Sequence, residues 1–255
     1  MSIENIIKES LEDLINAIII DGTCNHLIFP QYRDKSTRHS EQELKQIFLK
    51  RVEDSNTYYS VETPTRLVYR FTDGAQEVKS PDSNPDNTYK SARFDVSLYS
   101  ENNKDALLSH IEFKYGNPDQ KNAICKDFLK LVSEVKFTNE KKNFFVHYLS
   151  VKEESGWKSR TFPSLFKKYC KSVKDIKKSF ENEDNQEFFG KLSENLSNVT
   201  VYLLCFFETS KSGLTYSFSL NDLKNYIDKK MDDKNSSEKD WLWLNEKIFN
   251  TENSI

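Results

Sequence analysis

Apolar residues recur at every third or fourth position in the first twenty residues, where Ile3, Ile7, Leu11, Leu14 and Ile18 mark one face. This spacing predicts an amphipathic helix over residues 3–20. Asp21-Gly22 follows it directly, and this pair is typical of a helix end.

A second helix is predicted to begin at Ser40. Ser40 and Glu43 have the spacing of a capping box, in which each side chain satisfies a free backbone donor of the first helical turn. The residues that follow carry one apolar face, formed by Leu44, Ile47, Phe48 and Val52. The helix is expected to end near residues 54–56.

The pattern then changes to a period of two, which is typical of strands. Residues 57–71 predict two strands or one strand broken at Pro64, and residues 72–90, rich in Pro, Asn and Asp, predict a long loop. Residues 92–99 alternate so that Phe94, Val96 and Leu98 share one face and Asp95 lies on the other. A turn at 101–105 leads to a partner strand at 106–115.

The second half mixes both patterns. Helices are predicted around 124–135, 162–180, 188–196 and 241–248, strands at 143–150, 199–209 and 214–220, and a polar segment at 228–240. The order strand, helix, strand across residues 106–150 favours an α/β arrangement, in which the last strand joins the sheet through a crossover.

The composition limits the class of protein. The chain has 255 residues, of which 36% are hydrophobic and 30% charged, as expected for one large globular domain or one domain with an appendage. The longest apolar run is Val201–Phe207, too short to span a membrane. No secretory signal pattern is present at the start, so a cytoplasmic location without membrane attachment is expected. The four cysteines lack paired spacing and are expected to be reduced thiols.

Positive charge is concentrated in residues 157–178, although the net charge of the chain is −3. We expect five side chains of this segment to contact nucleic-acid phosphates: Lys158, Arg160, Lys167, Lys168 and Lys171. The alternative is a solvated Lys-rich helix in a chain that is Lys-rich throughout.

The candidate chemistry lies on the predicted strands 92–99 and 106–115. Glu112 and Lys114 are two residues apart and share a face, and pairing across the turn would bring Asp95 beside Glu112. Two carboxylates on neighbouring strands offer the oxygen ligands that Mg²⁺ prefers, and leave positions for water and a phosphate oxygen. Lys114 would orient or deprotonate that water and offset transition-state charge. These residues predict metal-assisted phosphodiester hydrolysis.

A structural alternative exists for the same three residues. The pattern Glu-x-Lys also occurs at Glu43, Glu77, Glu134 and Glu140 and is therefore uninformative alone. Only Glu112 combines a predicted strand with an Asp-bearing strand immediately upstream. Asp95, Glu112 and Lys114 would otherwise be ordinary cross-strand ion pairs on a solvated sheet face.

The order of helix, strands, Asp95, Glu112-Phe113-Lys114, helix and strand resembles the PD-(D/E)xK nuclease superfamily, which has the restriction-endonuclease-like fold. The resemblance covers residues 40–150 and lacks the proline before the aspartate, where Phe94 stands. It implies an α/β fold with an αβββαβ core, whose mixed central sheet is flanked by helices. Residues 1–39 would add an N-terminal helix and connector, and residues 151–255 a basic helical segment, a hairpin and C-terminal helices on the same domain.

The resemblance also implies roles for individual residues. Asp95 and Glu112 would hold Mg²⁺, with Mn²⁺ as an alternative ion, and Lys114 would be the general base or the water-orienting residue. Some members carry a glutamate at the start of the first core helix, and here Glu41 lies on the flank of the buried stripe whereas Glu43 points away. Glu41 is therefore the candidate fourth site residue, and simple helix-start electrostatics is the alternative.

The expected function is a divalent-metal-dependent endonuclease acting on DNA in a restriction or antiviral defence setting. A homodimer or a partner subunit is compatible with the resemblance. Two alternatives stay open: an RNA nuclease on the same scaffold, and a catalytically silent nuclease-like fold that binds a partner.

Overall fold

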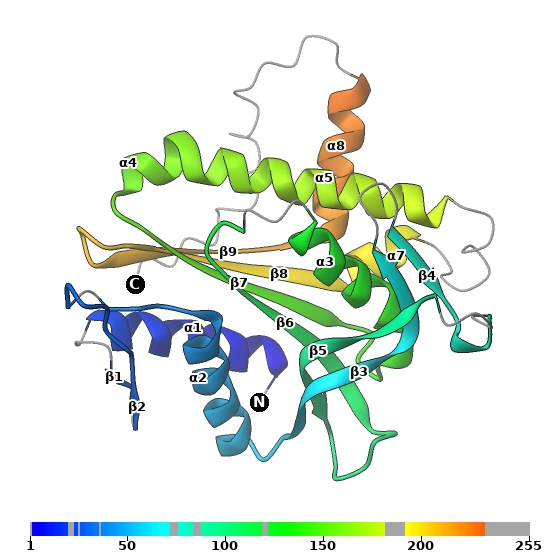
Figure 1. The fold of residues 1–255 in the computed structure, drawn as a ribbon, viewed down its shortest axis with the longest axis horizontal. Helices are drawn as coiled ribbons and strands as arrows, with labels where there is room; N and C mark the ends of the chain where they lie inside the picture. Colours follow the sequence, from blue (N-terminus) through cyan, green and yellow to red (C-terminus); the bar gives the residue numbers. More distant parts are fainter. Residues whose placement is uncertain are drawn as a thin grey trace.

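The computed structural model describes residues 2–19, 23–24, 26–35, 37–71, 76–83, 88–118, 122–181 and 192–232. They form an α/β fold in which a seven-stranded mixed sheet lies between two layers of helices (Figure 1). The sheet order is β4-β3-β5-β6-β7-β8-β9. The strands are β3 Tyr58–Phe71, β4 Gln76–Lys79, β5 Lys90–Tyr99, β6 Leu107–Tyr115, β7 Asn143–Val151, β8 Val199–Phe207 and β9 Ser212–Ser219.

The middle of the sheet is parallel and its two sides are antiparallel. Strands β6, β7 and β8 run parallel to one another, and all other neighbouring strands pair antiparallel. Helix α3, Ala123–Glu134, forms the connection from β6 to β7. The predicted crossover is therefore confirmed, since parallel neighbours require a connection that returns across the sheet.

One helical layer comes from the N-terminal part of the chain. Helices α1, Ile3–Ile19, and α2, Glu41–Asp54, pack together on one face of the sheet (Figure 1). The apolar stripes read from the sequence are buried there, with Ile7, Leu11, Leu44 and Phe48 each at most 2% exposed. Both N-terminal helices are confirmed, and burial of the predicted faces explains why they form.

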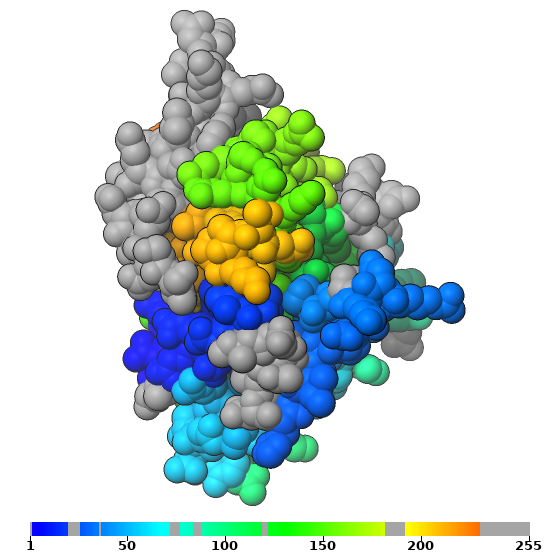
Figure 2. Space-filling model, turned by 90° about the vertical axis from the view of Figure 1, so that its left-hand side faces the viewer, coloured from blue at the N-terminus to red at the C-terminus, as the bar shows by residue number. Residues whose placement is uncertain are grey.

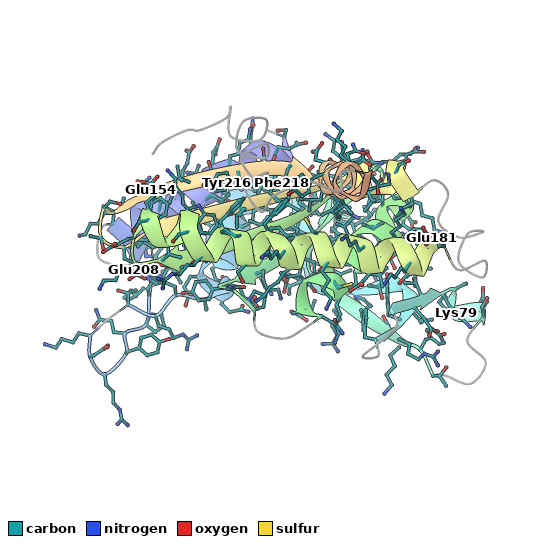
Figure 3. All side chains as sticks on the ribbon, turned by 90° about the horizontal axis from the view of Figure 1, so that it is seen from above. Lys79, Glu154, Glu181, Glu208, Tyr216 and Phe218 are labelled. Carbon is teal, nitrogen blue, oxygen red and sulfur yellow. The ribbon has the colours of Figure 1, made fainter. Side chains whose placement is uncertain are left out.

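The opposite face is covered by α3, by α5, Phe162–Phe180, by α7, Leu192–Ser197, and by α8, Leu220–Asp232 (Figure 1). Helix α5 follows a short helix α4, Glu154–Gly156, and a π-helical turn η3, Trp157–Thr161, which the sequence did not predict. Together these three elements run along the length of the sheet between the labelled Glu154 and Glu181 in Figure 3. In the side view of Figure 2, the α4–α5 region, the β8–β9 hairpin and α1 follow one another from top to bottom.

Residues 58–71 form one strand with a register shift between Pro64 and Val68, which confirms the alternative of a single strand broken at Pro64. Several other predicted boundaries are wrong. The predicted loop 72–90 contains strand β4 and a 3-10 turn, Pro81–Ser83. The connector after α1 contains a two-stranded hairpin, β1 Thr23–Cys24 with β2 Leu27–Ile28. Helix α8 occupies residues expected to be strand end and polar segment. The predicted helix 241–248 lies outside the described residues, as does the first part of 188–196.

In the described part of the chain, no helix is both long and apolar enough to cross a membrane.

Candidate active site

The candidate site lies where β5 and β6 stop pairing. Their backbone register begins at Val96 opposite Ile111 and continues toward the turn. On the other side of this point, an Asp95 oxygen, Oδ2, accepts a hydrogen bond from the Phe113 backbone N–H at 2.8 Å. The Asp95 side chain thus accepts the hydrogen bond that a backbone carbonyl of β5 would accept in a regular ladder. It lies beside Phe113, the residue that follows Glu112.

The predicted alternation of β5 is wrong at Phe94. Val96 and Leu98 pack toward α1 and α2, whereas Phe94 packs in the cluster beneath α3 and α5 and stacks on His110. The neighbouring strand β3 is irregular at this level, because Glu62 has a φ of 51° between the pairs Val61–Val96 and Thr63–Phe94. A non-glycine residue in the left-handed region is uncommon and marks a local distortion of the backbone, although β3 keeps its register with β5 at this position.

Lys45 of α2 reaches Asp95 from one side of the sheet. Its Nζ lies 3.4 Å from Oδ1 of Asp95 and 3.5 Å from Oε1 of Glu62. The Lys45 side chain is only 8% exposed. Its burial is offset by these two carboxylates, because a buried ammonium group requires partners.

Helix α3 reaches Glu112 and Lys114 from the other side. The Lys130 ammonium donates a short hydrogen bond to Oε1 of Glu112, and lies 2.8 Å from the Arg93 carbonyl oxygen and 3.2 Å from Oδ1 of Asp127. Lys114 pairs with Oδ2 of Asp127 at 3.1 Å. Glu112 and Lys114 therefore project from the same face of β6, as predicted, and Asp127 connects the two lysines.

Glu41, in the first turn of α2, belongs to the same electrostatic cluster. Burial raises the pKa of its carboxyl group, Lys114 lowers it, and Asp95 and Asp127 raise it further. Capping of α2 is performed instead by its neighbours, since the Ser40 hydroxyl accepts from the Gln42 N–H at 3.3 Å and donates to Glu43. The prediction that Glu43 points away from the buried face is wrong, because Glu43 is buried and Glu41 is half-buried.

The acidic groups of the cluster disfavour one another's ionised forms. The pKa of Glu112 is raised well above its ordinary value, first by burial and then by Asp127 and Asp95, against the opposing effect of Lys130. For Lys114, burial lowers the pKa, but Asp127, Glu41 and Glu112 together raise it on balance. Lys114 therefore keeps its proton at neutral pH, which favours orientation of water and charge stabilisation over proton abstraction.

The donor set matches the chemistry of Mg²⁺, which is usually held by one or two carboxylates together with waters and substrate phosphate. Asp95 and Glu112 are the two carboxylates at the point where β5 and β6 separate. Within the described residues, no group of three or more His, Cys, Asp or Glu side chains is arranged to hold a metal ion. Burial is the largest cause of the raised pKa of Glu112, and Asp127 and Asp95 add to it a negative potential that a cation at this place would relieve.

Three residues of the cluster were missed by the sequence argument: Lys45, Asp127 and Lys130. A signal for Lys45 is available, because it follows Glu41 by four residues and so lies on the same side of α2. Asp127 and Lys130 are three residues apart on α3 and lie beside its apolar face. Their contact with Glu112 depends on how α3 crosses the sheet, which the sequence pattern does not specify.

The side chains of the basic segment differ in their exposure and in their contacts. Lys167 and Lys171 are exposed on α5, where Lys174 and Lys178 continue the same row. Lys168 is half-buried and donates to Asn117 and to the Pro118 carbonyl oxygen at 2.6 and 2.7 Å. Lys158 and Arg160 are exposed in the π-helical turn, and Lys158 pairs with Glu154.

Comparison of the chain with family models, with curated proteins and with solved structures finds no significant match.

Proposed function

We propose that this chain is a divalent-metal-dependent nuclease with a restriction-endonuclease-like core, acting most readily on DNA. The observation that carries the proposal is the neighbourhood of Asp95 and Glu112 where β5 and β6 separate: Asp95 accepts from the backbone N–H of Phe113, acts electrostatically on Glu112, and Lys114 shares the face of Glu112. The order α2, β3, β5, β6, α3, β7 supports the αβββαβ core, with β4 added at the edge of the sheet.

Asp95 and Glu112 would hold Mg²⁺ or Mn²⁺, which supplies polarisation of a phosphoryl oxygen and acidification of bound water. Hydrolysis joins the water oxygen to phosphorus and breaks the bond to the leaving sugar oxygen, which takes a proton. Lys114, kept protonated by Asp127, would orient the water and stabilise charge on the phosphoryl group. Glu41 would add a further acidic group on the α2 side.

The test is cleavage of supercoiled plasmid, linear duplex, single strands and RNA, each with Mg²⁺, Mn²⁺ or EDTA. We expect metal-dependent cleavage of DNA by the full chain. Glu112→Gln should abolish it, and Glu140→Gln, an exposed glutamate, should not. Cleavage in EDTA, or full activity of Glu112→Gln, would contradict the proposal.

Two further outcomes are informative. Cleavage of RNA alone would assign the same site to an RNA nuclease, because both polymers share the phosphodiester. No cleavage of any substrate would favour a silent nuclease-like fold that binds a partner. A role in restriction or antiviral defence is the biological setting that we propose for the DNA nuclease, in the cytoplasm and as a homodimer or with a partner subunit.

A further inference from the structure

A cavity of about 610 Å³ opens beside the candidate active site, at the end of β3, β5 and β6 nearest the 101–105 turn. Its lining includes three tyrosines, two cations and one histidine: Tyr58, Tyr59, Tyr99, Arg66, Lys104 and His110. Its volume lies within the range of small-molecule sites and is sufficient for a nucleotide.

The aromatic rings of this cavity are unusually accessible. Tyr58 is 49% exposed and Tyr59 is 36% exposed, and with Val61 they are among the few large hydrophobic side chains exposed in the described chain. The Tyr59 hydroxyl is held by Glu53 at 2.8 Å, and the Tyr99 hydroxyl lies 3.2 Å from that of Ser60. Tyr59 and Tyr99 are thus fixed at their polar ends, and the exposed apolar surface of the cavity indicates a binding site.

The inner wall carries an unsatisfied polar group. His110 is 3% exposed, and its Nδ1 lies 2.7 Å from the Ser97 hydroxyl. Its Nε2 is buried and has no hydrogen-bond partner among the residues that the structure describes. Such an atom is costly to leave unpaired, and a ligand that reached it could supply the missing hydrogen bond.

The position of the cavity connects it to the cleavage site. His110 and Glu112 lie on the same face of β6, two residues or roughly 7 Å apart along the strand. On β3, Thr63 lines the cavity and directly follows Glu62, which pairs with Lys45. A ligand in the cavity would therefore lie next to a phosphate placed at Asp95 and Glu112.

We infer that this cavity is a subsite for an unpaired nucleotide, whose base stacks on the ring of Tyr58 beside its cross-strand partner Tyr99 while Arg66 and Lys104 attract the adjoining phosphates. The inference rests on the proposed function, which places the phosphodiester backbone at the neighbouring carboxylates. Aromatic side chains with nearby cations are the means by which proteins bind single strands without sequence preference. A duplex would need to open locally to fill such a subsite.

The experiment compares a fluorescein-labelled single-stranded oligodeoxynucleotide with an abasic strand of equal length and charge. Both are titrated with the full chain in EDTA, so that binding is measured without cleavage. We expect the base-bearing strand to bind roughly fivefold more tightly or better, as stacking of a single base predicts. Equal affinity of the wild type for both strands would overturn the inference, and this comparison does not depend on any variant.

Variants then assign the preference to the cavity. Tyr58→Ala should reduce affinity for the base-bearing strand roughly fivefold and leave the abasic strand unaffected, whereas Tyr58→Phe should retain the preference. Tyr32→Ala is the matched control, because Tyr32 is 57% exposed and lies outside the cavity lining. A preference that survives Tyr58→Ala unchanged would overturn the inference, as would an equal loss of affinity for both strands.

The two proposals fail in distinguishable ways. Metal-dependent plasmid cleavage without any preference for the base-bearing strand would remove the subsite and keep the nuclease. A Tyr58-dependent preference in EDTA, without cleavage of any substrate in Mg²⁺ or Mn²⁺, would keep the subsite and remove the nuclease. If the cavity serves to bind a peptide and not a nucleotide, the two strands should bind with equal affinity, and that result would count against the inference.

Discussion

Lys130 on α3 and Glu112 on β6 form a buried ion pair, with side chains that are 9% and 5% exposed. The Lys130 ammonium also lies within hydrogen-bonding distance of the Arg93 carbonyl oxygen and Asp127, so it binds three oxygen atoms of the candidate active site. This is the set of contacts that a bound cation makes. Lys130 therefore holds the carboxylates together, and a divalent ion bound by Glu112 would compete with it for the same oxygen.

Removing this ammonium should expose the negative charge of the site. Lys130→Met leaves Glu112 without its partner and should lower the free energy of unfolding by about 3–5 kcal/mol. Mg²⁺ should then raise the melting temperature of the variant more than that of the wild type, because it can replace the lost charge. Thermal unfolding with Mg²⁺ and with EDTA measures both effects.

Lys50→Met is the matched control for Lys130→Met. Lys50 pairs with Asp54 on the surface of α2, and its side chain is 54% exposed. Exposed pairs contribute little, so its melting temperature should match that of the wild type with and without Mg²⁺. If Mg²⁺ stabilises Lys130→Met no more than this control, Glu112 does not belong to a cation site.

Variants of Lys114 test whether this residue acts as a protonated, charge-stabilising group or as a general base. Its pKa is raised above the ordinary value, because Asp127, Glu41 and Glu112 outweigh the lowering effect of burial. The amine therefore stays protonated up to a pH above its ordinary pKa, and the pH profile of cleavage should show no rise that reports its deprotonation. Lys114→Arg should keep part of the activity, and Lys114→Met should lose about two orders of magnitude. Equal loss in both variants, with a rate that rises as the wild-type amine deprotonates, would indicate a general base instead.

Local patterns were sufficient for much of the fold and for part of this site. The apolar stripe of α2 predicted which face is buried, and the strand period predicted that Glu112 and Lys114 share a face. The Ser40–Glu43 contact was readable from spacing, because a capping box joins residues three apart. Each of these features depends on neighbours in the sequence.

The rest depends on contacts between distant elements. The rotation of β5 that separates Phe94 from Val96 occurs opposite Glu62, a residue of another strand with a φ of 51°. Strand β4 is only four residues long and is stabilised by pairing with β3, so its own sequence carries a weak signal. Likewise, the pairing of Lys130 with Glu112 is set by the position of α3 over the sheet.

Glu41 and Ser40 are neighbours whose variants should behave in opposite ways. Glu41→Gln should reduce cleavage roughly tenfold and leave stability unchanged or slightly increased, because a half-buried acid with a raised pKa is being neutralised. Ser40→Ala removes the N-cap and should cost about 1 kcal/mol of stability with little effect on cleavage. Urea unfolding and the plasmid assay together separate the two roles. A Glu41→Gln enzyme with wild-type activity would leave Glu41 outside the site.

The exposed lysines along α5 should contribute to the affinity for DNA and not to the rate of cleavage. Replacing Lys167, Lys171 and Lys174 with Gln should weaken duplex binding and reduce the slope of log affinity against log salt by about 2–3, since each phosphate contact releases counterions. Cleavage at saturating DNA should be retained. Lys168 is left intact in this variant, because it anchors the segment after β6 through Asn117 and Pro118.

A control of equal charge distinguishes a DNA-binding row from overall charge. Lys8, Lys50 and Lys142 are exposed, and the first two belong to α1 and α2 on the opposite face of the sheet, where Lys142 pairs with Glu4. Their triple substitution with Gln changes the net charge by the same amount. If both triple variants reduce the salt slope equally, the α5 row has no specific part in binding.

Glu134, at the end of α3, should make the stability of the fold depend on pH. Its Oε1 accepts from the Leu67 N–H at 2.7 Å and lies 3.3 Å from the Tyr69 hydroxyl, whereas Oε2 has no hydrogen-bond partner in the described part of the chain. Burial raises the pKa of the carboxyl group to about 7, although backbone hydrogen bonds from Leu67 and Arg66, the Tyr69 hydroxyl and the Arg66 charge all oppose the rise.

The sign of the effect follows from where the proton is held. The folded protein binds the Glu134 proton more tightly than the unfolded chain, whose carboxyl group has the ordinary pKa of 4.5. The contribution to stability is therefore complete below pH 4.5 and is lost as the pH rises to about 7, by up to roughly 3 kcal/mol. Glu134→Gln keeps an oxygen acceptor for Leu67 and cannot ionise, so its stability should fall less than that of the wild type over this interval.

Urea unfolding of wild type and variant at several pH values between 4.5 and 7.5 measures the difference directly. Taking the difference cancels the contributions of the other buried groups, including His110 and His147, whose pKa values burial lowers to about 3 and about 4. Glu140→Gln, an exposed glutamate six residues further along the chain, should follow the wild type at every pH. If the curves for Glu134→Gln and the wild type stay parallel across this range, the Glu134 carboxyl group is ionised in the folded protein at neutral pH, and another donor must reach its second oxygen.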